Sequence, residues 1–250
     1  MAAMTAVRID IAEKVFPAVA GGPARGLYHD FRLEVADKSF VALLGPSGLG
    51  KTTLLNIVAG VDRDFKGRVT FESKAAPRIG YAFQSPRLLP WRTVLQNVTL
   101  PLEPGSASAE RAKAVLAEMG LADAHDVYPE RLSLGMQRRV ALARAFALQP
   151  DLLLMDEPFV SLDEQTADRL RDLLANLVQR HPATILFVTH DSREAVRLAD
   201  RVVVLGGPPV RIEHDVRIEL SPEARRNAGE VERVRGSLTS AGPALAVARA

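Results

Sequence analysis

The nine residues GPSGLGKTT place three glycines, one lysine and two threonines between two apolar stretches, SFVALL and LLNIVAGV. Glycines allow a loop to wrap closely around a ligand with several N–H groups pointing inward, and a following helix N-terminus adds positive potential. In the pattern G-x-x-x-x-G-K-[ST], the lysine reaches the outer phosphates of a nucleotide and the next hydroxyl binds Mg²⁺. The predicted phosphate-binding residues are Gly45, Pro46, Ser47, Gly48, Leu49, Gly50, Lys51, Thr52 and Thr53, with Thr52 also a metal ligand. A chance glycine-rich turn is the alternative, and the apolar strand before the loop argues against it.

Two adjacent carboxylates, Asp156 and Glu157, end the apolar run in DLLLMDEP. The carboxyl ends of parallel strands face one crevice, so we expect both groups at the edge that carries the phosphate loop. There, Asp156 would hold the Mg²⁺ shell and Glu157 would activate water. An acidic helix cap before Pro158 is the alternative.

Two further apolar runs lead into polar residues: FVTHD ends in His190 and Asp191, and IGYAF is followed by Gln84. A lone histidine is more often structural than catalytic. Here, however, four apolar runs each deliver a residue suited to phosphate chemistry, and this convergence predicts a nucleotide-hydrolysing site.

The elements that must position these residues follow an α/β pattern. Short continuous apolar runs are typical of a parallel sheet buried on both faces, and they occur at 40–44, 152–155, 184–189 and 202–205. Alternating residues between Val7 and Val35 predict an antiparallel β subdomain, with a turn at 20–26. We expect one domain over 1–250. It comprises a nucleotide-binding core at about 7–84 and 150–215, an inserted helical subdomain at about 85–149, and a C-terminal extension at about 216–250 that frays after Thr239.

The composition narrows the function. The chain of 250 residues has no cysteine, which excludes disulfides and thiolate metal sites. A net charge of +2 gives no reason to expect nucleic acid as a partner. Its apolar stretches are about half the ~20 residues needed to cross a bilayer, and the N-terminus lacks the features of a secretory signal. We expect a cytoplasmic protein.

At this point the sequence resembles the ATP-binding-cassette ATPases over about residues 7 to 215. The most diagnostic element is LSLGMQRRVALARA at 132–145, which is similar to the family signature LSGGQ and its basic, alanine-rich helix. SLD at 161–163 resembles the D-loop, Gln84 the Q-loop glutamine and His190 the switch histidine. Phe16 stands where the family stacks an aromatic ring on adenine.

The resemblance implies a mechanism. Two copies would face head to tail around two ATP molecules and Mg²⁺, with Ser133 and Gly135 reaching the nucleotide of the other copy and Asp163 lying at the same site. Glu157 would act on the water, His190 would stabilise the developing charge, and Gln84 would contact the metal.

Within the family, FQSPRLLPWRTVLQNVTLPLE resembles import ATPases of the nitrate, sulfonate and taurine type. This implies a permease that docks near 84–98, a separate solute-binding protein, and a place on the cytoplasmic face of the inner membrane. Trp91 is explained equally by docking and by simple packing. The alternatives are a soluble cassette that acts without a membrane partner and a non-hydrolysing regulatory cassette.

One residue departs from the signature. Leu134 occupies the place of the first glycine, adds a Cβ and loses the freedom of glycine at positive φ. We expect little cost if the backbone there is helical, and impaired closure if the chain must approach the phosphate tightly.

Overall fold

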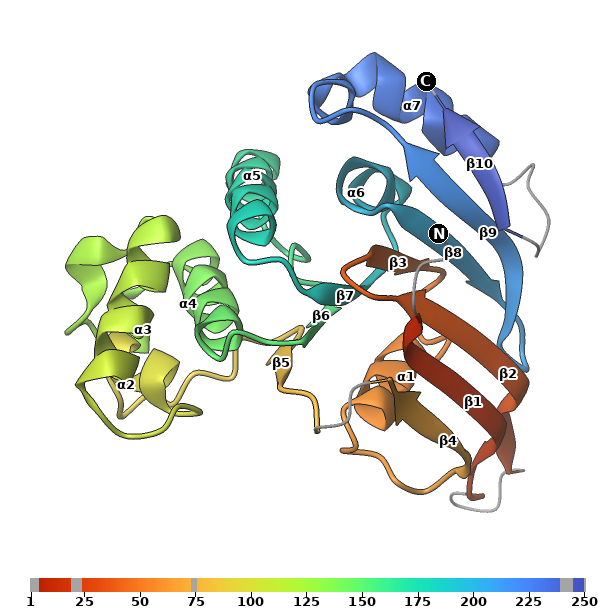
Figure 1. Ribbon diagram of the computed structural model, residues 1–250, viewed down its shortest axis with the longest axis horizontal. Helices are drawn as coiled ribbons and strands as arrows, with labels where there is room; N and C mark the ends of the chain where they lie inside the picture. The colour runs from red at the N-terminus through yellow and green to blue at the C-terminus, as the bar shows by residue number, and fades with distance from the viewer. Residues whose placement is uncertain (1–4, 19–23, 73–75, 239–244, 250) are drawn as a thin grey trace. The chain divides into compact units, whose positions relative to one another are not determined.

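The computed structural model describes residues 5–18, 24–72, 76–238 and 245–249 (Figure 1). The strands are β1 (Thr5–Phe16), β2 (Arg25–Ala36), β3 (Phe40–Leu44), β4 (Lys66–Phe71), β5 (Ile79–Ala82), β6 (Leu152–Asp156), β7 (Thr184–Thr189), β8 (Arg201–Gly206), β9 (Arg211–Glu219) and β10 (Leu245–Arg249). The α-helices are α1 (Lys51–Val58), α2 (Val94–Thr99), α3 (Ser106–Glu118), α4 (Leu134–Ala147), α5 (Glu164–Arg180), α6 (Ser192–Leu198) and α7 (Ala228–Ser237). Short 3₁₀ helices occupy Ala122–Ala124, Pro129–Arg131 and Ala224–Arg226.

The chain divides into two compact units, one of Met1–Ala76 with Thr184–Ala250 and the other of Pro77–Ala183. The second unit contains α2, α3 and α4 together with the strands β5 and β6 and the helix α5. The predicted nucleotide-binding core and helical subdomain were defined by their expected roles and have other bounds than these compact units. The predicted boundaries therefore stay a prediction.

In the first unit, β2, β1 and β4 form an antiparallel sheet in that order. Val7, Ile9 and Ile11 of β1 are buried and alternate with more exposed residues, as a sheet with one covered face requires. This confirms the predicted N-terminal antiparallel subdomain.

The other strands of the first unit lie in the order β10, β9, β8, β3 and β7. The strand β3 is parallel to both β7 and β8, whereas β8 and β9 are antiparallel. Every residue of β7 is buried, which explains its continuous apolar sequence TILFVT. These strands confirm the predicted α/β core.

In the second unit, β5 is parallel to β6, and each residue of β6 is buried. Residues 85–149, all of which the structure describes, form helices and loops without a strand. The helix α4 packs against both α2 and α3, and its alanine-rich sequence permits this close approach. The expected helical character of this region is therefore present.

The C-terminal tail differs from expectation. Residues Leu245–Arg249 form β10, which pairs in parallel with β9, and the backbone hydrogen bonds of that pairing order a segment whose sequence shows no period. Residues 239–244 and most of the expected turn at 20–26 lie outside the described part of the chain. Among the helices that are described, none has the length and apolarity to cross a membrane.

Candidate nucleotide site

The phosphate loop joins β3 to α1 in the first unit. Gly48 and Gly50 have φ of 75° and 113°, a left-handed conformation that residues with a side chain rarely adopt. Gly50 is the N-cap of α1, and no side chain caps this helix. A helix N-terminus without a side-chain cap, preceded by left-handed glycines, suits a bound phosphate.

Lys51 lies inside the loop, with only 4% of its surface exposed. Its Nζ donates hydrogen bonds to the carbonyl oxygens of Gly45 at 2.7 Å and Pro46 at 2.9 Å. A Cβ on Gly45 would lie 2.9 Å from the carbonyl oxygen of Leu205, so the loop fits only with glycine there. The residues present therefore fit a nucleoside triphosphate, and the carbonyl groups of the loop already surround the ammonium group of Lys51.

Two side chains that the sequence did not single out support this loop. The hydroxyl of buried Tyr28 donates to the carbonyl oxygen of Gly50 at 3.0 Å, and Arg25 donates to that of Gly48 at 3.2 Å. Both residues belong to β2, so the antiparallel sheet holds the loop from the side. No sequence motif marks them.

Phe16 is the last residue of β1, and its side chain is 40% exposed. The Nζ of Lys14 lies 5.1 Å from the centre of its ring. Lys14 itself is buried and anchored, because it donates to Asp62 at 3.0 Å and to the carbonyl oxygen of Asp64 at 2.6 Å. The ammonium therefore lies over one face of an exposed aromatic ring in a cation–π contact, and the stacking of Phe16 on adenine stays a prediction.

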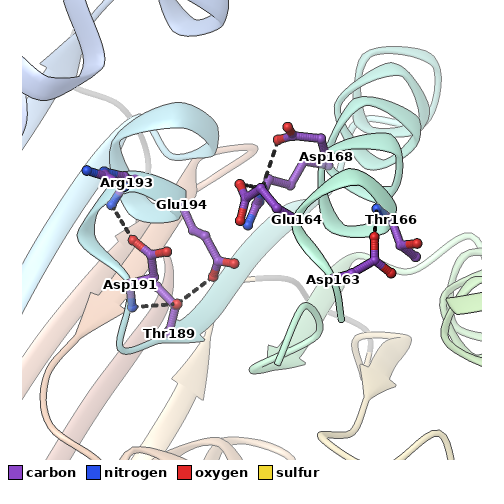
Figure 2. Close-up of polar contacts among 9 residues, drawn as sticks. Asp163, Glu164, Thr166, Asp168, Thr189, Asp191, Arg193 and Glu194 are labelled. Atoms are coloured by element: carbon purple, nitrogen blue, oxygen red, sulfur yellow. Dashed lines mark hydrogen bonds and ion pairs between the residues drawn. The ribbon is translucent and has the colours of Figure 1, made fainter. Parts of the chain in front are cut away.

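His190 is exposed in the turn between β7 and α6. Figure 2 shows how this turn is held: buried Thr189 donates to the carboxylate of Glu194 at 2.7 Å and accepts from the N–H of Asp191 at 3.0 Å. The side chain of Asp191 then caps α6 by accepting from the N–H of Arg193 at 2.7 Å. Bonds on both sides of His190 thus fix its main chain, and sequence reasoning missed the contribution of Glu194.

The carboxylates lie in the second unit. Asp156 is the buried last residue of β6, and Glu157 follows it, half-buried, with φ of 43°. No helix begins at Pro158, because α5 starts only at Glu164, so the alternative of an acidic helix cap is wrong. Gln84 is exposed after β5 of the same unit.

The signature residues lie at the N-terminus of α4. Ser133 is its N-cap and accepts from the N–H of Met136 at 3.3 Å. Leu134 is the first helical residue, so its backbone does not need the conformational freedom of glycine. It is 40% exposed. A Cβ on Gly135 would lie 2.6 Å from the methyl carbon of Thr166 in α5, so this glycine also allows the two helices to approach.

Asp163 is the N-cap of α5 and accepts from the N–H of Thr166 at 2.9 Å (Figure 2). Hydrogen bonds from Thr166 lower the pKa of Asp163. Two turns into the same helix, Arg171 pairs with Glu164 at 3.1 Å and Asp168 at 2.8 Å. The structure thus gives the aspartate a local structural role, and its predicted contact with nucleotide stays a prediction.

The described residues contain no group of three or more histidine, cysteine or acidic side chains that could hold a metal by themselves. Mg²⁺ commonly binds through one or two protein groups, several waters and substrate phosphates. The predicted ligands Thr52, Gln84 and Asp156, a hydroxyl, an amide and a carboxylate, have the oxygen chemistry for that mode.

Comparisons with known proteins identify the family of this chain. The ABC transporter family model matches residues 28–160. An ABC transporter ATP-binding protein of Methanocaldococcus jannaschii is 45% identical over 210 residues, covering 80% of this chain and 78% of the relative. The aliphatic sulfonates import ATP-binding protein SsuB 1 of Frankia alni is 45% identical over 234 residues, 89% of this chain and 85% of the relative.

A solved structure is also similar. It is the dimeric post-hydrolysis state of the ATP-binding cassette MJ0796 bound to ADP and Pi, with a TM-score of 0.74 and 29% identity, over 86% of this chain and 100% of that one. The fold and the loop around Lys51 define a P-loop ATPase. The chain belongs to the ABC transporter family, among its ATP-binding proteins, as its motifs predicted.

Proposed function

We propose that the chain is the ATP-hydrolysing, energy-coupling subunit of an importer for a small anionic solute such as an alkanesulfonate. The names of several relatives, which are sulfonate import ATP-binding proteins, support this solute class. The observation that carries the coupling role is the exposed side chain of Trp91, which lies on a hydrogen-bonded loop after the Q-loop glutamine, Gln84. The alternative is a cassette that acts without a membrane partner.

Each site residue has a proposed role in hydrolysis. The loop amides and Lys51 bind the β- and γ-phosphates, and Phe16 stacks on adenine. Glu157 accepts a proton from the attacking water, and His190 stabilises charge on the γ-phosphate. Thr52, Gln84 and Asp156 would hold Mg²⁺, which would supply Lewis-acid stabilisation of the phosphate oxygens.

We propose that two copies work as a head-to-tail dimer. The dimeric cassette with 29% identity supports this arrangement. Ser133 and Gly135 lie at the N-terminus of a helix of 14 residues, where main-chain N–H groups and the helix dipole favour an anion. In the dimer, that anion is the γ-phosphate held by the other copy.

The segment 84–98, where the permease would dock, is partly exposed and is held by hydrogen bonds. Trp91 is 71% exposed, so packing within this chain does not explain it. Beside it, the fully buried side chain of Asn97 accepts from the N–H of Leu89 at 2.8 Å and donates to the carbonyl oxygens of Leu89, Arg92 and Thr93 at 3.0 to 3.1 Å. A clamped loop loses little conformational entropy on binding, so an apolar partner helix is favoured there.

Cross-linking tests the permease partner. We expect a cysteine introduced at exposed Arg92 to cross-link to the cognate permease in membranes that contain both proteins, because it neighbours Trp91. The chain has no native cysteine, so the label reports one position. A cysteine at exposed Arg211, in the other unit, is the matched control. Cross-links from the control position alone would contradict the proposal.

Leu134 gives a test of the dimer. Its helical backbone removes the expected strain, but its exposed side chain stands beside the two signature residues. We expect Leu134→Gly, in a Glu157→Gln background that strongly slows hydrolysis, to strengthen ATP-dependent dimerisation. A steric penalty of about 1.4 kcal/mol corresponds to about tenfold where the closed state is minor. Analytical ultracentrifugation with and without ATP measures the effect, and equal or weaker dimerisation would show that the leucine is accommodated in the closed state.

A further inference from the structure

Arg138 lies one turn into the signature helix α4, and only 5% of its surface is exposed. Its guanidinium forms a fork. Nη1 donates to the carbonyl oxygen of Gln84 at 2.8 Å and, more weakly, to that of Glu157 at 3.4 Å, and Nη2 donates to that of Val160 at 2.7 Å. One side chain thus joins the helix to the Q-loop and to the loop after β6.

Burying the charged guanidinium of Arg138 costs free energy. Burial lowers the pKa of Arg138, and its Nε is buried without a hydrogen-bond partner. An apolar side chain of similar size usually serves stability at least as well as a buried charge. The position is therefore better explained by what the guanidinium holds than by packing alone.

The loop that Arg138 holds has an unusual backbone. Glu157 has φ of 43° and Ser161 has φ of 63°, and neither is glycine. Such residues persist only where their surroundings over-determine them. The carbonyl oxygens of Glu157 and Val160 that accept from Arg138 belong to the segment 157–161, which begins and ends with these two left-handed residues, so the guanidinium is one of the contacts that fix it.

We propose that Arg138 is a positioning residue for hydrolysis, which sets the main chain of Glu157 and Gln84 from the signature helix. The inference rests on the proposed roles of these two residues. It adds a physical link within one chain, from the helix whose N-terminus meets the nucleotide of the other copy to the residues that act on its own nucleotide.

The test is a double-mutant cycle on the full chain with Mg²⁺ and ATP. Arg138→Met is expected to lower kcat by about ten- to a hundredfold while KM changes less than about threefold, because the lost contacts act on a catalytic group rather than on ATP binding. In the Glu157→Gln background, measured by single turnover, the same substitution is expected to lower the rate less than about twofold.

Arg139→Met is the matched control. It lies on the same helix, and its guanidinium donates to a main-chain carbonyl oxygen, that of Met119 at 3.2 Å, away from the catalytic loop. We expect near wild-type kcat from this variant. Equal losses in the two variants, or full additivity of Arg138→Met with Glu157→Gln, would overturn the inference.

Two further measurements keep the outcomes distinct. If circular dichroism shows that Arg138→Met does not fold, Arg138→Lys replaces it in the test, because lysine retains the charge but lacks the forked guanidinium. It is expected to fold and to lose kcat by an intermediate factor, and wild-type kcat in that variant would overturn the inference. If Glu157→Gln alone hydrolyses ATP at the wild-type rate, the proposed function fails at Glu157 and the inference falls with it. If Glu157→Gln lowers kcat but Arg138→Met leaves it at the wild-type value, the inference about Arg138 is wrong and the proposed function stands.

Discussion

Glu157→Gln is expected to lower kcat for ATP hydrolysis by about 10²–10⁴-fold, the range for loss of a general acid–base group. The substitution keeps the size of the side chain and its strained backbone but removes the proposed proton acceptor. Because such a group acts mainly in the transition state, ATP affinity should change little. Steady-state hydrolysis and calorimetric ATP binding measure the two quantities.

Asp151→Asn provides the control, since Asp151 is a carboxylate that directly precedes β6, whereas Glu157 directly follows this strand. Asp151 precedes β6 and accepts from the N–H of Arg78 at 2.8 Å. The hydrogen bond from Arg78 lowers the pKa of Asp151, so this variant should affect stability rather than turnover. Wild-type turnover in Glu157→Gln would remove that residue from the mechanism.

Lys51→Ala is expected to weaken ATP binding by about ten- to a hundredfold, from the 1.5–3 kcal/mol that hydrogen bonds to charged groups contribute. The ammonium now bonds to two loop carbonyls, which phosphate oxygens would replace. Because Lys51 is buried and so bonded, we also expect a modest fall in the melting temperature of the nucleotide-free protein.

Lys66→Ala removes the same charge from the surface of the same unit and should leave ATP affinity unchanged. Lys66 is exposed and pairs with Glu13 across the antiparallel sheet. Calorimetry with ATP and thermal unfolding without it separate binding from stability. A large fall in melting temperature of Lys51→Ala with unchanged ATP affinity would show that the lysine is only structural.

The strands whose residues are buried on both faces could be predicted from the sequence, because a short continuous apolar run suits a strand that is covered on both sides. The strand β10 could not, since it depends on pairing with β9 rather than on its own pattern. The alternation in β1 also fails part-way. Ile11 is buried, but the next fully buried residue is Lys14, because the register shifts between Ile11 and Glu13. A bulge of this kind turns the following side chains to the other face.

For the site, the motifs predict which residues would meet a nucleotide, since their spacing reflects the chemistry directly. They could not identify the residues that hold those groups in place. Arg138 stands in the quoted signature helix, but its partners lie 54, 19 and 22 residues away along the chain. Such contacts are to main-chain carbonyls, which every residue has, so no side-chain pattern records them.

Solute uptake into proteoliposomes shows most directly whether ATP hydrolysis by this chain drives import through a permease. The vesicles contain the cognate permease and this chain, with ATP inside. A labelled alkanesulfonate and the proposed solute-binding protein are added outside. We expect ATP-dependent accumulation of the label with the wild-type chain and none with Glu157→Gln. Equal uptake with both chains, or none with either although the wild-type chain hydrolyses ATP in the same vesicles, would contradict the proposed coupling.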